Sequence, residues 1–191
     1  MAEDREILRS IASGDRTVFS IFYTRYAQKV YNTALSYSKN VVEAEEITQD
    51  VFIKIYQKAS TFKGKSSVNT WVYRIAVNTS LNYTKKKQRL TLLKKEHEYA
   101  GDTDFQHPGA LLENKENAAT LFKVMDHLPP NQKIAFILSF IEDLPRQEVA
   151  DIMEISLKAT ESLLQRAKKS MRIELEKIYP HRRISEKGLS K

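Results

Sequence analysis

Cysteine is absent from the 191 residues, which excludes a disulfide framework, a zinc ribbon and a thiol nucleophile. The four histidines are scattered without the spacing of metal ligands: His97, His107, His127 and His181. No apolar run of membrane-spanning length occurs, and the first residues carry mixed charges instead of the apolar stretch of a secretion signal. We therefore expect a cytoplasmic protein with no metal, no other cofactor and no membrane insertion.

Glycine and proline are also scarce, with only five of each, which favours long helices with few sharp turns. The hydrophobic fraction of 41% is slightly low for a globular domain, and the charged fraction of 29% is slightly high. Both values suit small helical units better than one large core. We predict an all-α fold of two small helical domains joined by a flexible linker.

Basic residues outnumber acidic ones by 31 to 24, and the net charge of +7 favours polyanionic partners. The charge changes sign abruptly in the middle of the chain. Residues 74–95 hold seven bases and no acid, whereas residues 96–117 hold six acids and one base. Helical periodicity weakens over 90–117, so this stretch is either a solvated tether or an acidic segment that occupies a nucleic-acid channel.

Apolar residues spaced three and four apart predict helices on both sides of this stretch. The first helix is expected to end at Ser13-Gly14-Asp15, with the glycine as its C-cap. Three more helices are expected around residues 19–35, 47–55 and 67–87. After the linker we expect one helix closed by Pro129-Pro130, an apolar helix over 134–141, and two further helices.

Those last two helices form a predicted helix-turn-helix from Arg146 to Gln165, with the small Ala150 at the crossing and Ser156 as N-cap of the second helix. Polar side chains on the exposed face of the second helix could enter a major groove. A plain helical hairpin is the alternative. Glu154 stands where a turn glycine is usual, which predicts a turn of different shape.

The helix that ends in Lys85-Lys86-Lys87-Gln88-Arg89 interleaves aromatic and amide side chains: Trp71, Tyr73, Asn78, Asn82 and Tyr83. Stacking surfaces, base-edge donors and phosphate-neutralising cations are what single-stranded DNA binding requires. We expect its apolar residues Trp71, Ile75 and Leu81 to lie in the core. The alternative is a basic helix end that only complements the helix dipole.

An acidic stripe is formed by Glu43, Glu46 and Asp50, three and four residues apart, while Ile47, Val51 and Phe52 are expected to face inward. In a basic protein, an acidic face does not suit DNA. It is therefore either a solvated surface or a face for docking another protein.

The segment from Glu43 to Phe52 closely resembles the polymerase-binding region of bacterial sigma factors. Phe62-Lys63-Gly64, Thr70-Trp71 and the residues 73–76 resemble the promoter-melting region of the extracytoplasmic-function group, and Leu128-Pro129-Pro130 with the helix-turn-helix resembles that group's second domain. The resemblance runs from about residue 18 to 176. It implies sigma region 2 at 1–89, a linker at 90–117, sigma region 4 at 118–179 and a polar, disordered tail at 180–191.

The resemblance also implies a role for each set of residues. Docking on the clamp helices of the largest polymerase subunit falls to Glu43, Glu46, Gln49, Asp50 and Phe52. Recognition and melting of the −10 element fall to Lys63, Asn69, Arg74, Asn78, Asn82, Lys85, Lys86 and Lys87. Reading of the −35 element falls to Lys158, Glu161, Ser162, Gln165, Arg166 and Lys169.

The implied partners are core RNA polymerase, promoter DNA and an anti-sigma factor, and the implied function is promoter recognition and opening without catalysis. Leu163 and Thr160 depart from the family pattern, so base preferences at −35 cannot be transferred. A stand-alone dimeric helix-turn-helix regulator is the alternative function, but a dimerisation module requires neither the acidic stripe nor the basic helix. A nucleic-acid-processing enzyme requires an acid cluster or a paired nucleophile, and the sequence shows neither.

Overall fold

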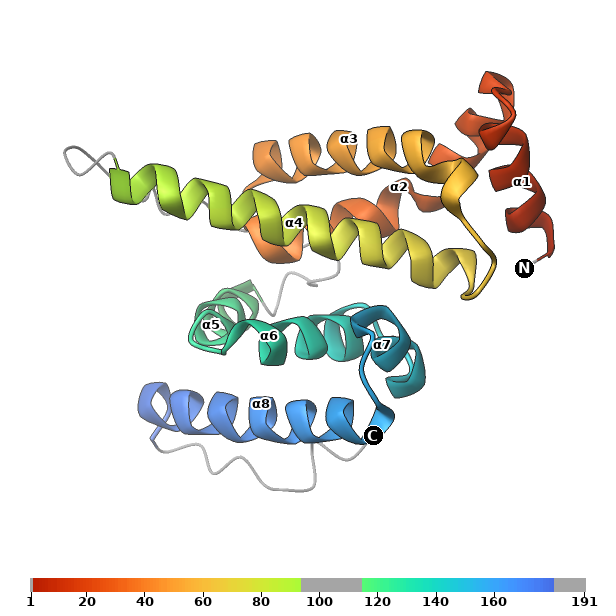
Figure 1. Ribbon diagram of the computed structural model, residues 1–191. Helices are drawn as coiled ribbons and strands as arrows, with labels where there is room; N and C mark the ends of the chain where they lie inside the picture. Colours follow the sequence, from red (N-terminus) through yellow and green to blue (C-terminus); the bar gives the residue numbers. More distant parts are fainter. Residues whose placement is uncertain (1, 94–114, 181–191) are drawn as a thin grey trace. The chain divides into compact units, whose positions relative to one another are not determined.

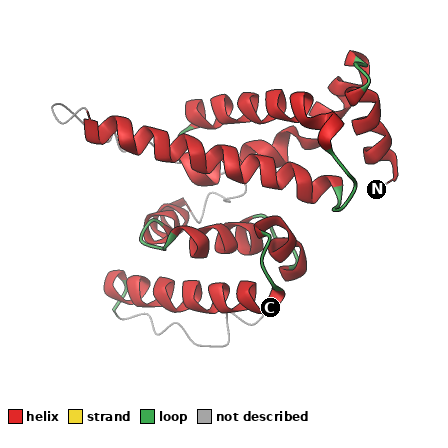
Figure 2. Cartoon of the chain, in the orientation of Figure 1, coloured by secondary structure: helices red, strands yellow, loops and turns green. Residues whose placement is uncertain are grey.

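The computed structural model describes residues 2–93 and 115–180, and all regular structure within them is helical (Figures 1 and 2). The chain divides into two compact units, Met1–Gly109 and Ala110–Lys191. The predicted all-α fold of two small helical domains is thereby confirmed. Most of the predicted linker, and the tail beyond residue 180, lie outside the described residues.

The first unit contains α1 (Ala2–Ala12), α2 (Arg16–Ser38), α3 (Val41–Lys58), a short 3-10 turn η1 (Ala59–Thr61) and α4 (Val68–Leu93). Helices α2, α3 and α4 pack along one another, and α1 packs at one end against α2 and η1 (Figure 1). Their shared core includes Leu8, Phe22, Leu35, Ile47, Ile55 and Val72, each at most 2% exposed.

The predicted break between the first two helices is confirmed. Gly14 has φ +95°, and the neighbouring Asp15 N–H donates to the Ser10 carbonyl at 3.0 Å. Asp15 then caps α2 by accepting from the Thr17 N–H at 2.9 Å. Hydrogen bonds from the hydroxyl and backbone of Thr17 hold the pKa of Asp15 below its ordinary value, so the carboxylate stays charged and keeps accepting.

The predicted break between the second and third helices is confirmed between α2 and α3, although it carries no glycine or proline. Lys39 ends α2 in the left-handed region with φ 57°, and its N–H donates to the Leu35 carbonyl at 2.8 Å. Asn40 then caps α3 by accepting from the Glu43 N–H at 3.0 Å. A polar cap residue replaces the usual turn residues here.

The second unit contains α5 (Lys115–Met125), α6 (Pro130–Phe136), a π-helical segment η3 (Ile137–Ile141), α7 (Arg146–Met153) and α8 (Leu157–Ile178). Helix α8 packs against α5, α6 and α7. The apolar helix expected over 134–141 is α-helical only to Phe136. It then widens, and the Glu142 N–H reaches the Ile137 carbonyl at 3.0 Å.

The expectation that Trp71, Ile75 and Leu81 lie in the core is confirmed in part: all three are only partly buried, and Trp71 and Ile75 pack against the core. Val68, Val72 and Ala76 of α4 belong to the core cluster, and Tyr73 and Val77 of the same helix are also buried. The small and β-branched side chains of the cluster let α4 approach α2 and α3 closely, whereas the partly buried Trp71 lies at the edge of this contact. Trp71 packs there against Phe62, with ring centroids 5.4 Å apart.

Replacement of Ile55 by alanine should lower the free energy of unfolding of the first unit by about 2–5 kcal/mol, because the side chain is fully buried. Ile53 lies two residues earlier and is 54% exposed. Ile53→Ala should therefore change the free energy of unfolding by less than about 0.5 kcal/mol. Trp71 is the single tryptophan of the chain and belongs to this unit, so urea unfolding followed by its fluorescence measures both variants. Equal effects would contradict the core assignment.

Candidate nucleic-acid and protein-binding surfaces

One face of α4 carries most of the side chains predicted to bind single-stranded DNA. Trp71, Arg74, Asn78, Asn82, Lys85 and Arg89 follow one another at intervals of three and four, so they form a single stripe along the helix. Asn78, Asn82 and Lys85 are exposed, as is Lys86 at the edge of the stripe. Stacking, amide and cationic groups therefore lie in a row about 27 Å long.

Two residues predicted for the same role lie on the opposite side of α4. Asn69 and Lys87 are each nine residues from Asn78, about two and a half turns, which places them half a turn around the helix. Asn69 accepts a hydrogen bond from the Lys29 ammonium on α2 at 3.1 Å. Lys87 forms an ion pair with Glu43 on α3. The predicted DNA-binding set is therefore divided between two faces.

The acidic stripe of α3 lies next to this second face of α4. Glu43 pairs with Lys87, and Glu46 accepts from the Tyr83 hydroxyl at 2.8 Å. Burial, and then this hydrogen bond, raises the pKa of Tyr83 to about 12, so the phenol remains a donor at neutral pH. Glu43 is mostly covered, at 17% side-chain exposure, whereas Glu46, Gln49 and Asp50 are exposed.

Phe52 must be removed from the predicted docking surface as a contact residue. It is 4% exposed and belongs to the core, where its ring lies 4.5 Å from that of Tyr23 and 6.3 Å from that of Phe19. Its position along α3 turns it toward α2. Two exposed apolar side chains accompany the acids instead, Val42 at 63% and Ile53 at 54% exposure.

The helix-turn-helix consists of α7, the turn at residues 154–156 and α8. Ser156 is the N-cap of α8, as predicted, and accepts from the Ala159 N–H at 3.2 Å. The prediction that Glu154 alters the turn is wrong, because Glu154 adopts the left-handed conformation itself, with φ 56° and ψ 40°. The Ile155 N–H then donates to the Ala150 carbonyl at 3.1 Å, as it would after a glycine.

The predicted DNA-reading residues of α8 lie on its outer side. Lys158, Glu161, Gln165, Arg166 and Lys169 are exposed, and Ser162 is partly exposed and accepts from Arg166 at 2.9 Å. Glu161 lies 3.7 Å from Arg146 of α7. Thr160 is fully buried, so its departure from the family pattern concerns packing, whereas Leu163 is partly exposed.

A basic pocket was not predicted from the sequence. Its volume is about 290 Å³, and Arg5 and Arg9 of α1 face Phe62, Lys63 and Gly64 across it. The only sequence signal was the spacing of the two arginines, one helical turn apart. Spacing alone could not show which element α1 packs against.

Neither a metal site nor a membrane span is found in the described parts of the chain. Residues 2–93 and 115–180 contain no group of three histidine, aspartate or glutamate side chains placed to hold a metal ion. None of their helices combines the length and the apolarity that crossing a bilayer requires.

The surfaces define a class: an all-helical protein in which one unit carries a helix-turn-helix and the other a basic helix beside an acidic face. The family model of sigma-70 region 2 matches residues 22–90, and that of sigma-70 region 4 matches residues 119–171. The chain belongs to the sigma-70 family and, within it, to the extracytoplasmic-function sigma factors.

Curated relatives match nearly the whole chain. The RNA polymerase sigma-H factor of Pseudomonas aeruginosa is 26% identical over 178 residues, covering 88% of this chain and 92% of the relative. The ECF RNA polymerase sigma-E factor of Escherichia coli is 27% identical over 176 residues, with the same two coverages.

Two solved structures share the fold. CnrH in complex with the cytosolic domain of CnrY matches with a TM-score of 0.66 at 18% identity, over 91% of this chain and 97% of that one. The sigma factor RpoE, in complex with the anti-sigma factor NepR from Bartonella quintana, matches with a TM-score of 0.63 at 20% identity. The match covers 83% of this chain and 96% of that one. The alternative of a stand-alone dimeric regulator is not favoured by any of these likenesses.

Ser156→Ala should open the first turn of α8, because the alanine cannot accept the Ala159 N–H. We expect a local loss of about 1 kcal/mol and hydrogen exchange of the Ala159 amide that is about fivefold faster by NMR. Ser170→Ala, in the body of the same helix, is the matched control and should leave this amide unchanged. Unchanged exchange in both variants would show that the cap does not hold the turn.

Proposed function

We propose that this chain binds core RNA polymerase through the exposed face of α3, holds single-stranded promoter DNA along α4 and reads duplex DNA with α8. As an extracytoplasmic-function sigma factor, it directs RNA polymerase to promoters. The observation that carries the assignment is the presence of both sigma-70 regions in one chain and in this order.

The proposed polymerase-binding face consists of Glu46, Gln49 and Asp50, with Val42 and Ile53 as apolar contacts at its edges. Exposed carboxylates guide a basic partner and set the register, whereas apolar side chains contribute most of the affinity once buried. Glu43 and Phe52 hold α3 in place behind this face: Glu43 pairs with Lys87 of α4, and Phe52 packs in the core.

Charge reversal at two positions tests this face. Glu46→Lys with Asp50→Lys should abolish binding to purified core polymerase, because two attractive contacts become repulsive in an interface where close charge pairs are worth several kcal/mol. Binding is measured by gel filtration of the mixture, and the circular dichroism spectrum should be unchanged.

The matched control is Glu6→Lys with Glu176→Lys, which makes the same charge change at exposed positions elsewhere. It should bind core polymerase normally. If the Glu46/Asp50 variant also bound normally, the docking face would be misassigned.

The proposed −10 surface is the α4 stripe together with Lys63 and Lys86. Opening of the duplex costs a few kcal/mol for each extruded base, and stacking on an aromatic side chain such as Trp71 returns about 1–3 kcal/mol. The amides of Asn78 and Asn82 can pair with base edges, and Arg74, Lys85 and Arg89 can neutralise phosphates. Asn69 and Lys87 face away and contact Lys29 of α2 and Glu43 of α3 instead.

Lys85 and Lys87 provide a matched pair of tests two residues apart. Lys85→Ala should weaken binding to single-stranded DNA about fivefold at about 0.1 M salt, because one phosphate contact is lost. Lys87→Ala should weaken it less than twofold, although it removes the same charge. Fluorescence anisotropy with a labelled single strand measures both, and equal losses would contradict the division of α4 into two faces.

The proposed −35 surface is the outer side of α8, where Lys158, Gln165 and Lys169 can reach bases and phosphates of a duplex. The two solved structures that share the fold are complexes, one with the cytosolic domain of CnrY and one with the anti-sigma factor NepR. We extend this to the present chain and propose that an anti-sigma factor holds it inactive. We further propose that it acts in the bacterial cytoplasm and performs no catalysis of its own.

A further inference from the structure

The pocket between α1 and the loop that follows η1 has two walls of different origin. Helix α1 contributes Arg5, Leu8 and Arg9, which share one face because they are three and four residues apart. The other wall is the segment from Ala59 to Gly64. Gly64 turns this loop with φ +69°, and its carbonyl accepts from the Arg5 guanidinium at 3.4 Å, which joins the two walls.

The pocket is cationic because basic side chains line it without an acidic side chain beside them in the described lining. Arg5, Arg9 and Lys63 line it, and none of the described residues that line it is acidic. The acids in the first turn of α1 are engaged elsewhere: Glu3 pairs with Arg25 at 3.0 Å, and Asp4 pairs with the same guanidinium. Three positive charges therefore surround a cavity large enough for a phosphate group.

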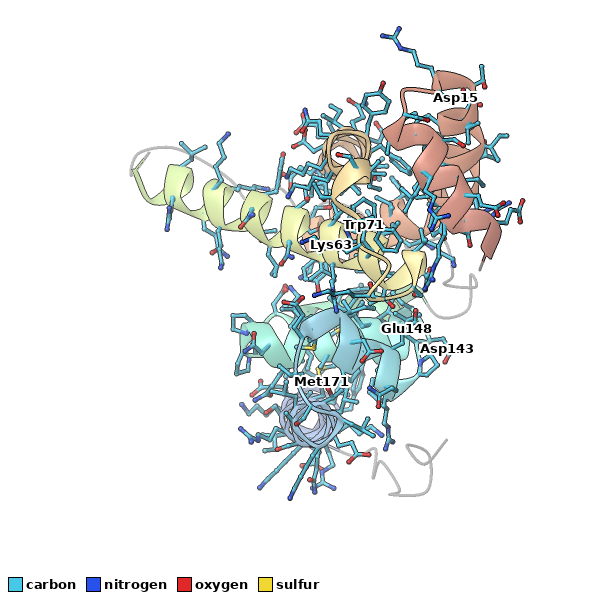
Figure 3. All side chains as sticks on the ribbon, turned by 45° about the vertical axis from the view of Figure 1, so that its right-hand side comes forward. Asp15, Lys63, Trp71, Asp143, Glu148 and Met171 are labelled. Atoms are coloured by element: carbon cyan, nitrogen blue, oxygen red, sulfur yellow. The ribbon has the colours of Figure 1, made fainter. Side chains whose placement is uncertain are left out.

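The pocket continues the DNA-binding stripe of α4. Phe62 lines it and also packs against Trp71, the first residue of that stripe, with ring centroids 5.4 Å apart. Figure 3 shows Lys63 and Trp71 at this same end of α4. A strand that follows the stripe from Arg89 to Trp71 therefore arrives at the mouth of the pocket.

We infer that this pocket binds a phosphate group of the single-stranded DNA that passes Trp71, and that Arg5 and Arg9 of α1 are its ligands. Guanidinium groups suit this role because their planar forks donate two hydrogen bonds to one phosphate. The inference rests on the proposed function of α4. It extends that function to α1, which precedes the residues matched by the region 2 model.

The test uses the full chain and a fluorescein-labelled oligothymidylate of about 20 nucleotides, followed by anisotropy across a range of salt. Arg5→Ala with Arg9→Ala should weaken binding about fivefold or more at about 0.1 M salt and reduce the slope of log Kd against log salt by about 0.7 per lost phosphate. Arg5→Lys with Arg9→Lys retains both charges and should restore most of the slope.

Arg16→Ala with Lys58→Ala removes two exposed cations of the same unit outside the pocket and should bind within twofold of the parent chain. Unfolding followed by Trp71 fluorescence shows whether the alanine pair is folded. If the folded alanine pair bound normally while Asn78→Ala with Asn82→Ala weakened binding, the pocket inference would be overturned and the α4 face would stand.

Two other results also overturn the inference. If neither pair of variants weakened binding, the proposed α4 face would fail together with the pocket. If calorimetry showed that inorganic phosphate binds at the arginines while the oligothymidylate is unaffected by their loss, the pocket would be a site for free anions and not for DNA.

Discussion

The 3.6-residue period of α4 is the constraint on which the first unit depends. One side of the helix supplies Val68, Val72 and Ala76 to the core, and the other carries the row from Trp71 to Arg89. Lys85 and Lys87 are identical in chemistry and almost adjacent in sequence. They nevertheless lie in different surroundings, because two residues along a helix span about 200° and so lie on opposite sides of it: Lys85 is exposed and Lys87 pairs with Glu43. Burial of one side leaves the polar residues Asn78, Asn82 and Lys85 exposed on another.

The packing of α3 on α4 fixes the distance between the two proposed binding surfaces. The ion pair of Glu43 with Lys87 and the hydrogen bond from Tyr83 to Glu46 join the helices near the acidic stripe. Surface contacts of this kind add little to stability, and the buried side chains between the helices supply most of it. The proposed polymerase-binding and DNA-binding surfaces therefore belong to one packed unit, so a partner bound to α3 would also position α4.

The second unit shows how tertiary packing overrides a local preference. A left-handed glutamate is unfavourable by itself, yet Glu154 adopts this conformation because the buried Val149, Ala150 and Leu164 hold α7 against α8. Thr160 is a polar residue in the same interior, and its hydroxyl donates to the Ser156 carbonyl at 3.2 Å. The departures from the family pattern are accommodated here without changing the shape of the motif.

Much of this protein was determined by its sequence alone. Periodicity and capping residues such as Gly14 and Ser156 predicted the helices, because these signals act within a few residues of the chain. The order of the sigma-like segments predicted the family. Only the tertiary structure decided which residues are available for binding. Phe52 is buried, Lys87 is paired, and Arg5 and Arg9 meet Lys63 across a pocket, because each outcome depends on which helix packs against which face.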